Sequence, residues 1–69
     1  MSSIKQHPAV ALGTRAAAAY LSVSEAGMHR WRLNGRGPTY SKLGARTVRY
    51  RIRDLDAFLE SHAVSSLES

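Results

Sequence analysis

The amino-acid sequence predicts a mainly α-helical domain that carries one small β-hairpin. Three observations predict this class. Apolar residues recur at helical spacing in three segments. Turn-forming residues separate these segments, and two short strand-like runs flank Gly44. With 69 residues, the chain has room for a single small domain.

The periodic patterns divide the chain into three parts. Residues 1–10 show no periodicity and include a His-Pro pair, so we expect a flexible arm. Residues 11–62 carry the helical and strand signals, and Ala11-Leu12 is a candidate short strand leading into this domain. Residues 63–69 follow the last apolar stripe, and we expect them to form a disordered tail.

The first helix is predicted over Arg15–Leu21, with Thr14 as its N-cap. Its run of four alanines has the highest intrinsic helix propensity and allows another helix to approach closely. Ala17, Tyr20 and Leu21 should share one face of this helix.

The second helix follows a tight turn at Ser22-Val23. It should begin after the N-cap Ser24 and run to about Leu33 or Asn34, where Gly35 ends it. Met28 and Trp31 lie at i, i+3 and should face inward. We expect Trp31 in the core rather than as a stacking platform for single strands. The opposite face should present Ala26, His29, Arg30 and Leu33.

Two runs, Tyr40–Leu43 and Thr47–Arg51, predict a hairpin. Val48 and Tyr50 alternate with polar and basic residues in the second run, which gives one apolar and one basic face. A third helix should begin near Asp54, whose carboxylate favours a helix N-terminus.

The third helix carries an apolar stripe of Leu55, Phe58 and Leu59 at i, i+3 and i+4. This stripe is expected to close the core. A dimer or filament interface is the alternative if part of it stays exposed.

Charge is distributed unevenly along this fold. Between Glu25 and Asp54 there is no acidic residue, although this stretch holds eight of the ten Lys and Arg residues. Four of the five acidic residues follow residue 53. Since the basic stretch also carries the second helix and the hairpin, it should present a folded basic surface to a polyanion, and nucleic acid is the leading partner.

The order of these elements is that of a winged helix-turn-helix: a helix-turn-helix, a two-stranded wing and a C-terminal packing helix. In that arrangement the second helix enters the DNA major groove and the hairpin follows the backbone to the minor groove. The predicted base contacts on the second helix are Glu25, Ala26, His29 and Arg30. The predicted phosphate contacts are Thr14, Arg15, Ser24, Arg32, Arg36, Lys42 and Arg49. The predicted minor-groove residues of the wing are Ala45, Arg46 and Thr47.

Several of these residues have a second interpretation. Arg30 can read guanine with a bidentate contact or hold a phosphate without reading sequence. His29 can touch a base or stack on a sugar, and Glu25 can accept from a cytosine amino group or keep phosphate away. Arg46 can enter the minor groove or remain a solvated turn residue, and basic phosphate candidates can be merely solvating.

The same residues resemble a known family. The chain is similar to the small excisionase-type proteins of the MerR-like superfamily, which include phage and plasmid excisionases and AlpA-like regulators. The similarity covers roughly residues 12–60, in order and at the family's spacing. It is carried by the segments LGTRAAAAYLSVS at 12–24, MHRWR at 28–32, GRGP at 35–38, KLGARTVRYR at 42–51 and DLDAFL at 54–59.

The resemblance implies a recombination directionality factor in the cytoplasm of a bacterial host cell. Such a protein binds and bends attachment-site DNA cooperatively and directs a phage or plasmid integrase towards excision. Larger MerR-type regulators dimerise through a long C-terminal helix, and this chain stops before one could form, so we expect a monomer in solution that assembles head-to-tail on DNA. The alternative on the same fold is a small transcriptional regulator that occupies a promoter. A basic protein-interaction adaptor is a more remote alternative.

The residues also indicate which functions not to expect. There is no nucleophile–base pairing, Gly-rich phosphate loop or convergent pair of carboxylates, so we expect no enzyme activity and no small-molecule ligand. The chain lacks cysteine, and its three histidines are far apart, so we expect no metal and no cofactor. No apolar run is long enough for a membrane span, and a soluble protein is expected.

Overall fold

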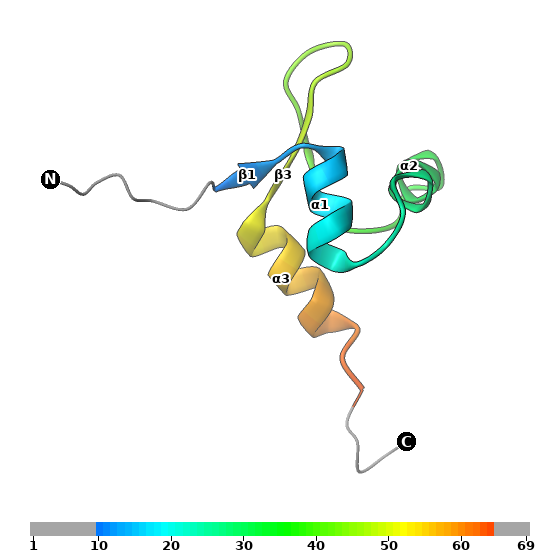
Figure 1. Ribbon diagram of the computed structural model, residues 1–69, viewed down its shortest axis with the longest axis vertical. Helices are drawn as coiled ribbons and strands as arrows, with labels where there is room; N and C mark the ends of the chain where they lie inside the picture. Colours follow the sequence, from blue (N-terminus) through cyan, green and yellow to red (C-terminus); the bar gives the residue numbers. More distant parts are fainter. Residues whose placement is uncertain (1–9, 65–69) are drawn as a thin grey trace, which may run out of the picture.

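The computed structural model of the chain describes residues 10–64 and contains three helices and three strands (Figure 1). Their order is β1 (Ala11–Leu12), α1 (Thr14–Leu21), α2 (Glu25–Leu33), β2 (Ser41–Lys42), β3 (Val48–Arg51) and α3 (Ile52–Ser61). Apart from residues 10, 63 and 64, the arm predicted over 1–10 and the tail predicted over 63–69 lie outside the described residues.

Helix α1 begins at Thr14, one residue earlier than predicted. Gly13 is extended at φ −71° and ψ 176° and occupies the N-cap position, because its carbonyl oxygen already accepts from the Ala17 N–H at 2.9 Å. Thr14 is therefore the first helical residue, and its predicted N-cap role is wrong. Its hydroxyl instead accepts a hydrogen bond from Arg32 of α2.

The turn between α1 and α2 is as tight as expected. Ser22 adopts the left-handed conformation at φ 59°. The Ser22 and Val23 N–H groups bond back to the last carbonyls of α1, at 3.1 and 2.9 Å. Ser24 then caps α2 as predicted, since its Oγ accepts from the Gly27 N–H at 2.9 Å.

Helix α2 ends in a Schellman motif around Gly35. The N–H of Gly35, at φ +67°, bonds to the Arg32 carbonyl, and the N–H of Arg36 bonds to the Trp31 carbonyl at 2.8 Å. Gly37, at φ +86°, then turns the chain back over the Trp31 side chain. This return directs the chain toward the wing.

Strands β2 and β3 form the predicted antiparallel wing, and β1 pairs with the other edge of β3. The register places Leu12 opposite Tyr50 and Lys42 opposite Val48. The paired segments are shorter than predicted, although the Leu43 N–H also bonds to the Thr47 carbonyl at 2.7 Å. Along β3, Val48 and Tyr50 point inward and the arginines outward, as the alternation predicts.

Helix α3 follows β3 without a connecting loop. It begins at Ile52, two residues before Asp54, with Arg51 in the N-cap position. The Arg51 Nε donates to Asp54 Oδ2 at 2.8 Å, which ties the cap residue to the first turn. Asp54 therefore favours the helix N-terminus as expected, but from inside the helix.

The core lies where α1, α2, β3 and α3 meet. Its buried members are Ala17, Ala18, Leu21, Met28, Tyr50 and Leu55. Trp31 and Phe58 are half-buried against it, with ring centroids 5.2 Å apart in an edge-to-face arrangement. Trp31 is thus a packing residue, as predicted.

Two residues of the predicted apolar helix faces, Tyr20 and Leu59, are only partly buried. Tyr20 is 42% exposed, because the face of α1 that packs into the core is formed by the small residues Ala17 and Ala18. The Tyr20 hydroxyl donates to Asp56 Oδ1 at 2.6 Å and so links α1 to α3. That hydrogen bond, with partial desolvation and the Asp56 charge, raises the pKa of Tyr20. Leu59 is 46% exposed, so only Leu55 and Phe58 of the predicted stripe contribute to packing.

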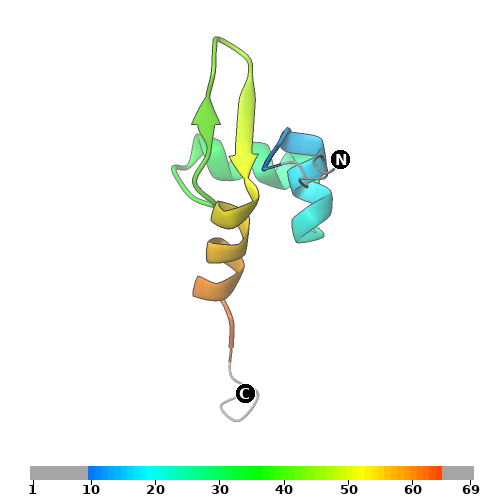
Figure 2. The same cartoon turned by 90° about the vertical axis from the view of Figure 1, so that its left-hand side faces the viewer.

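Figures 1 and 2 show how these elements position a projecting wing. The hairpin extends from one side of the helical body, and α3 extends from the other end of β3 in the opposite direction. Helix α2 lies across the base of the hairpin in Figure 2. The three helices and the antiparallel hairpin form the predicted winged helix-turn-helix.

Candidate nucleic-acid interface

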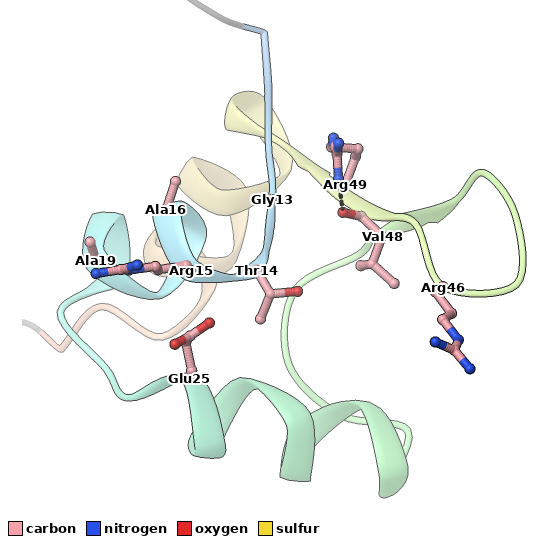
Figure 3. Close-up of a pocket in the computed structure, with 9 residues that line it drawn as sticks. All are labelled: Gly13, Thr14, Arg15, Ala16, Ala19, Glu25, Arg46, Val48 and Arg49. Carbon is pink, nitrogen blue, oxygen red and sulfur yellow. Dashed lines mark hydrogen bonds between the residues drawn. The ribbon is translucent and has the colours of Figure 1, made fainter.

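An open groove of about 670 Å³ lies between the start of α1, the start of α2 and the wing (Figure 3). It brings together residues that are far apart in the sequence. Its lining residues are Gly13, Thr14, Arg15, Ala16, Ala19, Glu25, Arg46, Val48 and Arg49. Five of these were predicted to contact DNA: Thr14, Arg15, Glu25, Arg46 and Arg49. Three arginines against one glutamate give the groove a positive balance.

The N-terminus of α1 opens onto this groove. Gly13 supplies no side-chain cap, and the first turn of a helix leaves its N–H groups without intrahelical partners. These N–H groups and the helix dipole favour an anion, and Arg15 stands beside them. The groove therefore has both the charge and the backbone donors that suit a DNA phosphate.

The side chains around the groove differ in direction (Figure 3). Glu25 extends from the start of α2 towards the start of α1, and Arg46 points from the wing loop towards the α2 side. Arg49 folds back so that its Nη1 donates to the Val48 carbonyl at 2.9 Å and lies near Gly13. Arg46 is thus the more extended of the two wing arginines.

The predicted reading face of α2 is exposed. Ala26, His29 and Arg30 all lie on the solvent side of the helix, opposite the buried Met28. Within residues 10–64, Arg30 takes part in none of the side-chain hydrogen bonds and is not in the ion pair, which joins Arg51 and Asp54. Its guanidinium is therefore available to a base or a phosphate.

Arg32 occupies a different position from the other arginines. Its Nη1 donates to Tyr50 Oη at 2.7 Å and to Thr14 Oγ1 at 3.2 Å. Its Nη2 lies 2.7 Å from His29 Nδ1, and its Cζ lies 5.8 Å from the Tyr40 ring centroid. One half-buried side chain thus links α1, α2, β3 and the segment before β2.

The remaining predicted contacts are distributed around this surface. Ser24 and Lys42 are exposed, and Ser24 can donate its hydroxyl proton while its oxygen caps α2. Ala45 and Thr47 are exposed in the wing loop beside Arg46. Arg36 instead lines a second hollow with Pro38, Asp54 and His62, away from the groove. The structure therefore does not bring Arg36 together with the other phosphate candidates.

Two features of this surface were not predicted from the sequence. Tyr40 and Tyr50 are partners of Arg32, and no spacing rule pairs residues 32, 40 and 50 before the fold is known. Leu43 is 68% exposed on the wing, although the strand pattern placed it in a hairpin arm. The alternation of side-chain directions along the strands could have indicated that Leu43 points outward, because Val48 and Tyr50 supply the inner face of the wing.

The part of the chain that the structure describes holds neither a metal-binding cluster nor a membrane-spanning helix. Residues 10–64 contain no group of three or more His, Cys, Asp or Glu side chains that could hold a metal ion. Among the described helices, none combines the length and apolarity needed to cross a membrane. The basic groove and the outer face of α2 are the features that carry a functional argument.

Comparison with known protein families agrees with this geometry. Residues 11–63 match a family model described as a helix-turn-helix domain, and the chain belongs to that family. No match to a curated protein was found. Membership implies that the protein binds double-stranded DNA, and the exposed face of α2 is the element with which such domains read sequence.

Proposed function

We propose that the protein is an excisionase, a recombination directionality factor of the MerR-like superfamily. In this role it binds and bends attachment-site DNA and directs a phage or plasmid integrase towards excision. The observation that carries the proposal is the placement of two basic elements around one groove, the start of α1 with Arg15 and the wing with Arg46 and Arg49. The motif resemblance over residues 12–60 supports the particular family.

Bending follows from how such a surface would meet a duplex. A helix in the major groove and a wing in the adjacent minor groove contact DNA on both sides of one backbone. DNA that curves towards the protein brings more phosphates to Arg15 and Arg49. The elastic cost of a bend of 40–90°, about 1–6 kcal/mol, must be offset by these extra contacts.

The proposal assigns roles to the predicted residues. Glu25, Ala26, His29 and Arg30 meet base edges, and the Arg46 loop, with Ala45 and Thr47, enters the minor groove. The proposed phosphate contacts are Thr14, Arg15 and Arg49 at the groove, with the exposed Ser24 and Lys42 on the surface around it. The role is non-catalytic and needs no cofactor. The protein is proposed to be a monomer in solution that assembles head-to-tail on DNA.

A bend assay tests this proposal directly. Fragments that carry the bound site at different distances from their ends should migrate differently in a gel when the protein is bound. The same site should support excision when an integrase that acts on it is added. Protein that binds the site tightly, leaves it straight and has no effect on the integrase would contradict the excisionase role. That result would favour the promoter-occupying regulator.

A further inference from the structure

We infer that Arg32 is a positioning residue, which fixes the tautomer of His29 so that α2 presents an N–H donor to the DNA. This inference rests on the proposed DNA-binding role of α2, which it deepens. Sequence pattern alone groups Arg32 with the phosphate contacts. Its contacts in the folded chain support a different role, and they also determine what kind of base His29 can read.

The chemistry of the two side chains sets the direction of the hydrogen bond. An arginine guanidinium has only donors, so His29 Nδ1, at 2.7 Å from Arg32 Nη2, must accept. A neutral imidazole that accepts at Nδ1 carries its proton at Nε2. Since His29 is exposed on the outer face of α2, this Nε2–H is available to a partner outside the protein.

The position of the guanidinium is fixed by its other contacts. Both Nη1 hydrogens are engaged, one by the Thr14 hydroxyl and one by the hydroxyl of Tyr50, which is only 1% exposed. A buried hydroxyl without a partner is unfavourable, so Tyr50 favours this orientation of Arg32. Tyr40 adds a cation–π contact at 5.8 Å. The orientation of His29 is thus determined from α1 and β3.

A fixed donor has a consequence for base selection. In the major groove guanine, adenine and thymine each present an acceptor, whereas cytosine presents only its N4 amino donor. His29 should therefore reject cytosine at the base it meets and accept the other three. Glu25, one turn earlier on α2, is a carboxylate acceptor and has the opposite preference.

The tautomer can be measured without DNA. Long-range proton–nitrogen correlation spectra of the free protein should show His29 in the Nε2–H form, with Nδ1 as the unprotonated nitrogen. In Arg32→Lys the pattern should become an average of the two tautomers, because one ammonium cannot reach Thr14, Tyr50 and His29 together. An Nδ1–H form, or a tautomer average, in the unmodified protein would overturn the inference whatever the protein does with DNA.

Selection from a duplex library with a randomised core tests the consequence for DNA. One position should be depleted of cytosine with the unmodified protein, and this depletion should disappear in both His29→Ala and Arg32→Lys. Because Arg32→Lys keeps the charge, its affinity for a scrambled duplex and its salt dependence should stay within about twofold. Arg53→Lys, an exposed change in the first turn of α3, is the control and should leave the selected pattern unchanged.

Two results of the selection would overturn the positioning role. One is an Arg32→Lys protein that selects the same sequences as the unmodified protein. The other is an equal loss of affinity for selected and scrambled duplexes in Arg32→Met, with a salt slope reduced by about one. That is the behaviour expected of a phosphate contact. If the unmodified protein binds no duplex at all, the DNA-binding role is contradicted. The tautomer measurement then remains as the test of the contact between Arg32 and His29.

Discussion

Replacing Gly37 by alanine should lower the free energy of unfolding by roughly 2–5 kcal/mol. The left-handed φ of +86° costs a residue with a Cβ about 1–2 kcal/mol. The new Cβ would also lie 2.8 Å from Trp31 Cβ, and overpacking of this kind costs about 1–3 kcal/mol. Trp31 Cβ is fixed to the α2 backbone, so the side chain cannot avoid the contact by rotating.

For a domain of this size the change is large. About 4–8 °C of melting temperature is lost per kcal/mol, so thermal unfolding should shift down by at least ~8 °C. Two other glycines provide matched controls. Gly44→Ala meets no atom within 4 Å and should be nearly neutral, whereas Gly35→Ala, at φ +67° in open space, isolates the backbone cost. Equal melting temperatures for the Gly37 and Gly44 variants would show that the return over Trp31 is not tightly packed.

Replacing Arg30 by alanine should reduce affinity for the selected duplex by about 5- to 150-fold. This range corresponds to the roughly 1–3 kcal/mol that a bidentate arginine–guanine contact contributes. Arg30 is exposed on the reading face of α2 and has no side-chain partner among the described residues. Affinity for a scrambled duplex should change much less. Titration of both duplexes at one salt concentration gives the ratio.

The control for Arg30→Ala is Arg53→Ala. It removes the same charge from an exposed position on α3, and both affinities should stay within about threefold of the unmodified protein. An equal loss on selected and scrambled duplexes would make Arg30 a phosphate contact. If Arg30→Ala and Arg46→Ala together leave tight DNA binding intact, the interface lies elsewhere and the protein-interaction adaptor becomes the better explanation of the basic surface.

Local signals in the sequence were sufficient for most of the fold. Helical spacing places Met28 and Trp31 inward, the Ser24 cap starts α2, and alternation orients Val48 and Tyr50. These features depend on neighbours within a few residues, so a single sequence contains them. The prediction of the helix ends was wrong where two neighbouring residues could both serve as the cap. Gly13 rather than Thr14 caps α1, because the backbone position, not the side-chain preference, decides which residue is the cap.

The tertiary partners could not be predicted in the same way. Tyr20 has the right spacing for the core, but α3 packs on the alanine face of α1 and leaves Tyr20 to bond Asp56, 36 residues away. Arg32 has the right charge for phosphate, yet three intramolecular acceptors surround it. Long-range partners of this kind depend on how the helices cross. That angle is set by packing and is not contained in any local pattern.

The central claim is that the outer face of α2, the start of α1 and the wing together contact duplex DNA. Amide chemical-shift mapping tests it most directly, by titrating the labelled protein with the selected duplex. The largest shifts should fall on residues 14–16, 25–30 and 42–49, and the exposed acidic side of α3 around Asp56 and Glu60 should change little. Shifts concentrated on α3, with α2 and the wing unchanged, would contradict it.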